Sequence, residues 1–140
     1  KVMAYGVMSM PAGKVTVKGP GVVKITVKAA ATTDYKAASK TVTVTVAPKK
    51  QSISLVNKIK KQLTIKWKKN TKASGYQVVY STNKKFTGKK TVRKAKTTTS
   101  YKIKGLKKGE KYYVKVRSYK TVNGKRIYGA YSTAKKATIK

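Results

Sequence analysis

Residues 63–67 read Leu-Thr-Ile-Lys-Trp, and residues 76–80 read Tyr-Gln-Val-Val-Tyr. Apolar and polar side chains alternate along the first stretch. Because successive side chains of a β-strand point to opposite faces, alternation predicts a strand with one buried face. We therefore expect Leu63, Ile65 and Trp67 to share the buried face of a strand, and the second stretch to form another.

The same two-residue period recurs along most of the chain, and no segment shows a helical period. A turn signal, Asn-Gly at 123–124, separates the last runs, because this pair tolerates the positive φ angles of a tight hairpin. Many short strands with turns between them predict an all-β fold of the sandwich type. The further runs lie at 14–18, 23–28, 41–46, 53–55, 91–92, 100–103, 112–117 and 131–139.

Pro48 marks the predicted boundary between two modules, because proline cannot donate a hydrogen bond to a sheet ladder. We predict a first module over 1–47, a linker over 48–51 and a second module over 52–140. Within the first module, residues 29–40 form a longer connection with room for one helical turn.

The second module carries further landmarks besides Trp67 and Tyr76: "GYQVVYST" at 75–82, "GLKKGEKYYVKVRSY" at 105–119 and "NGKRIYGAYS" at 123–132. With these motifs it resembles a fibronectin type III domain, of the lysine-rich kind found in surface proteins of Firmicutes. The resemblance implies that Leu106 and Tyr112 form a tyrosine corner, in which a backbone group binds the buried phenol. It also implies that Trp67 and Tyr76 belong to the core.

The first module, in "GKVTVKGPGVVKITVKAAATTDYKAASKTVTVTV", resembles the C-terminal part of a bacterial Ig-like domain. Such domains have about seven strands and about 100 residues, which is more than this module offers. The expected architecture is therefore tandem β-sandwiches, with a partial Ig-like module first. A neighbouring domain or subunit would complete it, because an open sheet edge rarely stays unpaired.

Composition restricts the chemistry. The 140 residues include 36 Lys and Arg, two Asp and Glu, no His and no Cys, for a net charge of +34. General acid–base catalysis uses His, Asp or Glu, and transition-metal sites use Cys, His or clustered carboxylates. Only Asp34 and Glu110 are available. We therefore expect no enzyme, no metal and no cofactor.

The basic residues suggest a polyanionic partner or a solubilising coat. Only Arg93, Arg117 and Arg126 are arginines, and lysine-dominated surfaces favour diffuse attraction over base or phosphate reading. Lysines at strand positions, Lys115 among them, fall on polar faces. A candidate ligand or anion surface gathers outward aromatic and basic side chains. It is either a stacking platform or simple cross-strand packing. Its members are Tyr113, Arg117, Tyr119, Arg126 and Tyr128.

The preferred function is a non-enzymatic spacer or adhesion module of a secreted or wall-associated protein of a Gram-positive bacterium. Its expected partner is an anionic cell-wall polymer or polysaccharide. The alternative is a subunit of an extracellular filament built by strand sharing. Nucleic acid is a weaker candidate, because no recognition motif accompanies the charge. No run is long and apolar enough for a transmembrane helix.

Overall fold

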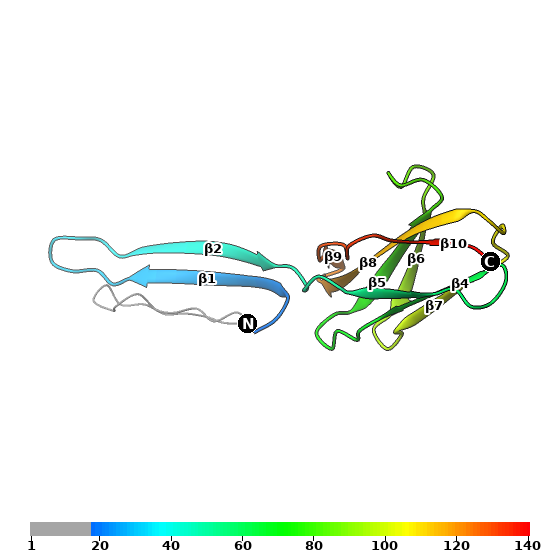
Figure 1. Ribbon diagram of the computed structural model, residues 1–140. Helices are drawn as coiled ribbons and strands as arrows, with labels where there is room; N and C mark the ends of the chain where they lie inside the picture. Colours follow the sequence, from blue (N-terminus) through cyan, green and yellow to red (C-terminus); the bar gives the residue numbers. More distant parts are fainter. Residues whose placement is uncertain (1–17) are drawn as a thin grey trace. The chain divides into compact units, whose positions relative to one another are not determined.

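The computed structural model describes residues 18–140. The chain divides into two compact units, and the boundary along the sequence lies between Val46 and Ala47. Every regular element among the described residues is a β-strand (Figure 1), so the all-β prediction is confirmed.

Residues 18–46 of the first unit form one antiparallel hairpin, β1 (Gly21–Ala29) and β2 (Ala38–Val46). Val23 pairs with Val44, and Ile25 pairs with Val42. The predicted strand at 14–18 lies outside the described residues except for its last position. No helical turn forms between the strands, because both strands extend further into the predicted connection and leave only residues 30–37 as a loop. A hydrogen bond from the Thr32 backbone amide to the Tyr35 carbonyl closes that loop.

The hairpin presents an aliphatic face that the described residues do not bury. Val23, Ile25 and Val27 of β1 and Val42 and Val44 of β2 share this face through the strand register. Val27 is 52% exposed, Val42 46% and Val44 36%. The alternation therefore marks a face suited to burial, and the Ig-like assignment of this unit stays a prediction.

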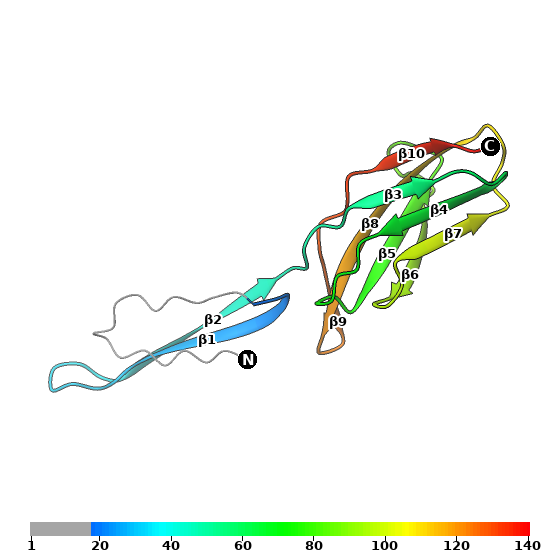
Figure 2. The ribbon, with the colours of Figure 1, turned by 60° about the horizontal axis from the view of Figure 1, so that its bottom comes forward.

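The second unit is a sandwich of two antiparallel sheets (Figure 2). One sheet has the order β3-β4-β7, and the other has the order β10-β8-β5-β6, with β9 paired to β8. The bounds are β3 (Ile53–Val56), β4 (Gln62–Trp67), β5 (Gly75–Ser81), β6 (Lys90–Ala95), β7 (Ser100–Lys104), β8 (Lys111–Val122), β9 (Lys125–Tyr128) and β10 (Lys135–Thr138).

The core fills the space between these two sheets. Leu63, Ile65 and Trp67 of β4 face it from one side, and Tyr76 and Val78 of β5 face it from the other. Leu63, Ile65, Tyr76 and Val78 are fully buried. The indole of Trp67 packs against Tyr76 with ring centroids 5.4 Å apart. Each alternating run thus supplies one layer of apolar side chains.

The hairpin between β8 and β9 turns at the predicted dipeptide. Asn123 has φ 49° and Gly124 has φ 76°, as a type I′ turn requires. Register then pairs Tyr119 of β8 with Tyr128 of β9.

Residues 48–51, predicted as a linker, lie within the second unit. Pro48 and Gln51 are buried. The Gln51 side-chain amide donates to the Lys68 carbonyl at 2.7 Å, and the Ser118 hydroxyl donates to the Lys49 carbonyl at 3.3 Å. These contacts fix the entry of the chain into β3.

The predicted last strand at 131–139 is too long, because β10 begins only at Lys135. Before that point the chain follows β8 irregularly. The Ser132 amide donates to the Val116 carbonyl, but the Val116 amide donates to the Ser132 hydroxyl. A side chain thus replaces a backbone acceptor and interrupts the regular backbone pairing at this point.

Candidate functional site

The outer face of the β10-β8-β5-β6 sheet carries a row of alternating aromatic rings and cations. We call it the aromatic–cation ladder. β8 places three of its members, at alternate positions, on this face, and β9, the segment before β10 and the loop after β5 supply the others. The members are Phe86, Lys115, Tyr131, Arg117, Tyr128, Tyr119 and Arg126.

Arg117 is the centre of the ladder. Its guanidinium carbon lies 3.7 Å from the ring centroid of Tyr128 and 4.4 Å from that of Tyr131. Its Nε donates to Oε1 of Gln77 at 2.6 Å, and the Tyr131 hydroxyl donates to the same oxygen at 3.1 Å. Gln77 is only 8% exposed. A buried amide oxygen therefore holds both the cation and one of its rings in place.

Lys115 continues the ladder on the other side of Tyr131. Its ammonium lies 4.3 Å from the Tyr131 centroid and 4.2 Å from that of Phe86. Burial, followed by the positive charges of Lys89 and Arg117, lowers the pKa of Lys115 below its ordinary value. Lys115 is thus only half-buried but is not the freely solvated lysine that its strand position predicts.

The opposite end of the ladder is built on the β8–β9 hairpin. The rings of Tyr119 and Tyr128 meet edge to face, with centroids 5.8 Å apart. Arg126 lies over Tyr119 at 5.5 Å. Tyr119 also covers Gly75, where a Cβ atom would lie only 2.5 Å from the tyrosine hydroxyl. The missing side chain at Gly75 therefore makes room for the ring.

The structure brings together four of the five residues of the candidate surface. Tyr113 shares the β8 face but has no ring or cation contact within the ladder. Three further members, Phe86, Lys115 and Tyr131, and the anchoring Gln77 were not predicted. The alternation along β8 could have indicated Lys115, which shares a face with Tyr113 and Arg117. Phe86 lies in a loop, and Tyr131 lies where a regular strand was expected, so no periodic signal indicates either residue.

The contacts within the ladder bear on what it can bind. Arg117 occupies ring faces of both Tyr128 and Tyr131, and Lys115 occupies ring faces of Tyr131 and Phe86. A stacked sugar or base needs an open ring face. The arrangement therefore favours the packing interpretation, in which cations and rings cover the outer side of β5. Gln77 and Val79 of β5 are accordingly buried although they face outward.

The other singled-out residues lie in or beside the core. Trp67 and Leu106 are each 6% exposed, and Tyr76 is fully buried. The Tyr76 hydroxyl accepts a hydrogen bond from the backbone amide of Asn70 at 2.6 Å. Tyr112 packs against the core from a half-buried position.

The partner of the Tyr112 hydroxyl is a side chain, where the family resemblance implied a backbone group. This hydroxyl donates to Oε2 of Glu110 at 3.1 Å. Burial and this hydrogen bond to a carboxylate raise the pKa of Tyr112. One of the chain's two carboxylates is thus engaged in a hydrogen bond at the corner.

The two carboxylates of the chain belong to different units. Asp34 belongs to the first unit and Glu110 to the second. Among residues 18–140 no three His, Cys, Asp or Glu side chains gather as metal ligands. That part of the chain also contains no helix capable of crossing a bilayer.

The two facing sheets and their connections define the second unit as a β-sandwich module. Residues 46–134 match the fibronectin type III domain, which is more than half of the chain. The chain belongs to the fibronectin type III domain family. Domains of this family are commonly extracellular spacer or adhesion modules and are generally non-catalytic.

Solved structures of low sequence identity share this fold. The FN1–FN3 domains of chicken CNTN1 match 74% of this chain and 37% of that chain, with a TM-score of 0.57 and 19% identity. A structure described as "Myokine structure" matches 66% of this chain and 98% of that one, with a TM-score of 0.52 and 15% identity. A fibronectin type III domain of human KIAA0970 matches 64% and 72%, with a TM-score of 0.50 and 18% identity.

One curated relative is a Kelch domain-containing protein from Sulfurisphaera tokodaii. It is 35% identical over 85 residues, which cover 61% of this chain and 11% of that protein. The chain therefore spans only a small part of the length of this relative.

Proposed function

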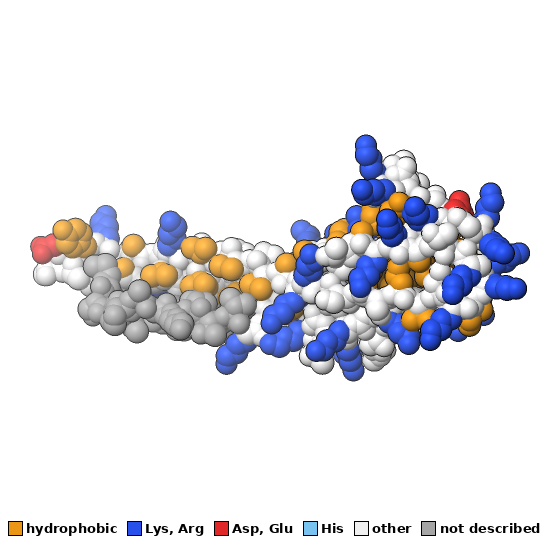
Figure 3. Space-filling view, viewed as in Figure 1, with side chains coloured by type: hydrophobic (Ala, Val, Ile, Leu, Met, Phe, Trp, Pro, Cys, Tyr) orange, Lys and Arg blue, Asp and Glu red, His pale blue; other side chains and the backbone are white. Residues whose placement is uncertain are grey.

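We propose that the chain is a spacer or adhesion module of a secreted or wall-associated protein of a Gram-positive bacterium. In this proposal its lysines give it a diffuse electrostatic affinity for anionic wall polymers or acidic polysaccharide. The observation that carries the proposal is the ratio of 36 basic to two acidic residues. Lys and Arg side chains are spread over the face of the second unit that Figure 3 shows, and most lysines of this unit are exposed.

The form of this charge supports diffuse attraction. Lys66 and Lys102 are exposed on the outer face of the β3-β4-β7 sheet, and Lys90 is exposed on the β6 edge of the other sheet. Lysine is a compact, hydrated point charge without the bidentate geometry of arginine. A surface of this kind attracts polyanions over its whole area and selects weakly among them. The scarcity of arginine also disfavours nucleic acid as the main partner.

The test is retention on isolated Gram-positive cell walls as the salt concentration rises. Exposed charges are screened over about 8 Å at physiological ionic strength, so retention should fall steeply above it. Walls stripped of teichoic acid serve as the control and should retain much less protein. Retention that is absent, or that does not respond to salt, rejects the proposal.

A second candidate function is a subunit of an extracellular filament, in which a neighbouring copy of the chain completes the first module. The exposed aliphatic face of β1 and β2 favours it, because a lone two-stranded hairpin is only marginally stable in water. A donated strand or sheet would bury Val27, Val42 and Val44.

Sizing and electron microscopy of the purified chain test this second candidate. Assembly that disappears in Val42→Lys and Val44→Lys variants supports it. The control is Thr43→Lys, which adds the same charge to the opposite face of β2. A monodisperse monomer at all protein concentrations contradicts it.

A further inference from the structure

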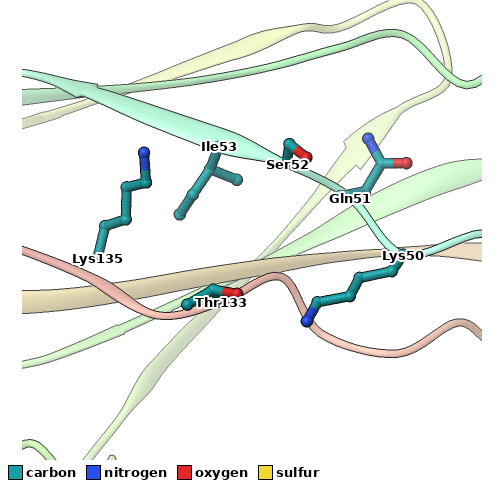
Figure 4. Close-up of a pocket in the computed structure, with 6 residues that line it drawn as sticks. All are labelled: Lys50, Gln51, Ser52, Ile53, Thr133 and Lys135. Atoms are coloured by element: carbon teal, nitrogen blue, oxygen red, sulfur yellow. The ribbon is translucent and has the colours of Figure 1, made fainter.

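A pocket of about 400 Å³ lies in the second unit, apart from the ladder, where the chain enters β3 and approaches β10. These two strands are edges of opposite sheets and lie side by side (Figure 2). The pocket thus opens at one margin of the sandwich. Six residues line it: Lys50, Gln51, Ser52, Ile53, Thr133 and Lys135 (Figure 4).

The polar lining of this pocket is suited to an anion. Lys50 and Lys135 supply two ammonium groups, and no carboxylate is among the lining residues. Lys50 extends toward Thr133, whose hydroxyl can donate a further hydrogen bond, and Ser52 offers a second hydroxyl (Figure 4). The ammonium of Lys135 lies at the other end of the pocket, beyond Ile53 (Figure 4). Hydrogen bonds from an ammonium to a carboxylate or phosphate are about twice as strong as neutral ones.

The wall of the pocket that precedes β3 is held by contacts within the second unit. Gln51 is 6% exposed and its amide nitrogen is bound to the Lys68 carbonyl. Ile53, also 6% exposed, is part of the core and gives the pocket an apolar surface. A site with a fixed wall loses less conformational entropy when a ligand binds.

The size of the pocket indicates the size of its ligand. Small-molecule sites have volumes of about 300–1,000 Å³, and this pocket lies in the lower part of that range. It has room for more than a bare ion. A sugar ring offers an apolar face for Ile53, hydroxyls for Ser52 and Thr133, and a charged substituent for the lysines.

We propose that this pocket binds one anionic sugar unit, with its carboxylate or phosphate held by Lys50 beside Thr133, its ring against Ile53 and Lys135 at the opposite end of the ring. The inference rests on the proposed function, because it names a specific subsite within the otherwise diffuse attraction to acidic polymers. It differs from that function in a testable way. The affinity of a diffuse surface depends only on the number of charges removed, whereas the affinity of a pocket depends on which positions lose them.

The experiment compares two double variants that remove the same charge. Lys50→Gln with Lys135→Gln changes the pocket. Lys66→Gln with Lys102→Gln changes the outer face of β4 and β7, where both side chains are exposed. Trigalacturonate, glucose 6-phosphate and neutral maltotriose are titrated into the full chain while amide NMR shifts are recorded. Trigalacturonate and glucose 6-phosphate distinguish a carboxylate ligand from a phosphate ligand.

We expect saturable shifts at Ser52, Ile53 and Thr133 with at least one anionic probe and none with maltotriose. The pocket variant should weaken binding of that probe about tenfold or more, since a charge-assisted bond from Lys50 and the positive charge of Lys135 are both lost. The β4–β7 variant should stay close to the unchanged chain. Equal loss in both variants, or shifts spread over all lysine-bearing strands, overturns the pocket.

Cell-wall retention, measured on the same proteins, separates this inference from the proposed function. Salt-sensitive retention that is equal in both variants, together with no pocket shifts, keeps the diffuse function and rejects the pocket. Pocket shifts without any wall retention support the sugar site and reject the wall as its target.

Discussion

The guanidinium of Arg117 lies 3.7 Å from the ring centroid of Tyr128, on the outward face of a sheet rather than in the core. The same cation contacts Tyr131 and the buried oxygen of Gln77. A charged side chain thus covers β5 from the solvent side. Arg117 is half-buried, and its hydrogen bond and its contacts with two rings can together stabilise the fold.

Replacing Arg117 therefore tests whether the ladder is structural. We expect Arg117→Ala to lower the free energy of unfolding by about 2 kcal/mol, because the cation–π contacts and one of the two hydrogen bonds to the Gln77 oxygen are lost. Arg117→Lys keeps the charge but cannot reproduce the planar stacking, so it should recover only part of the loss. Chemical denaturation followed by Trp67 fluorescence gives both values.

Arg93 provides the matched control for that series. It lies beside Gln77 on the exposed edge strand β6. Surface substitutions of this kind usually change stability by no more than about 0.5 kcal/mol. If Arg93→Ala and Arg117→Ala were equally destabilising, net charge and not the ladder would account for both.

Trp67 tests the core. It is 6% exposed and packs against Tyr76, so Trp67→Ala should cost about 3–5 kcal/mol. Because this variant has no tryptophan, circular dichroism must report its unfolding. Trp67→Phe should cost much less, since the buried indole nitrogen has no hydrogen-bond partner to lose. An unfolding midpoint that barely moves in Trp67→Ala contradicts the core assignment.

The sequence predicts the core well because burial on one sheet face leaves a two-residue period in the chain. Leu63, Ile65 and Trp67 alternate with polar residues, and their layer follows directly. The weak runs at 91–92 and 100–103 also lie within the strands β6 and β7. Residues that alternate along a regular strand can therefore be predicted from the sequence.

The ladder is only partly predictable, because some of its residues lie on regular strands and others lie in irregular segments. Arg117 and Tyr119 follow the period of β8, and register with β9 adds Tyr128. Phe86 and Tyr131 reach the ladder from irregular segments, where position depends on tertiary contacts such as the Ser132 hydroxyl bond to Val116. The pocket beside β3 combines the segments at 50–53 and 133–135, and no pattern in either segment indicates that they meet.

Gly129 should tolerate no side chain. A Cβ atom at this position would lie 2.5 Å from the Pro48 carbonyl oxygen, which belongs to the backbone and cannot rotate away. We expect Gly129→Ala to destabilise the second unit by about 1–3 kcal/mol, as overpacking generally does. Thermal unfolding measures the effect. The neighbouring exposed Ala130→Ser is the control, and an equal melting temperature for all three proteins would disprove the close approach.

Lys115 should give the chain a distinctive pH dependence. Its pKa is lowered from 10.5 in the folded state by burial and by neighbouring positive charge. Between the lowered value and 10.5 the unfolded chain binds more protons, so the contribution of Lys115 to stability rises with pH there. Tyr112 acts in the opposite sense above 10.0, because its raised pKa makes the folded state hold its proton longer.

The measurement is the difference in unfolding free energy between the unchanged chain and Lys115→Gln, followed from pH 7 upward. This difference should move in favour of the unchanged chain before pH 10.5 is reached, although deprotonation also weakens the cation–π contacts with Phe86 and Tyr131. An NMR titration of the Lys115 side chain should show it losing its proton with a midpoint below pH 10.5. A midpoint at or above pH 10.5 would mean that the ladder does not desolvate its ammonium group.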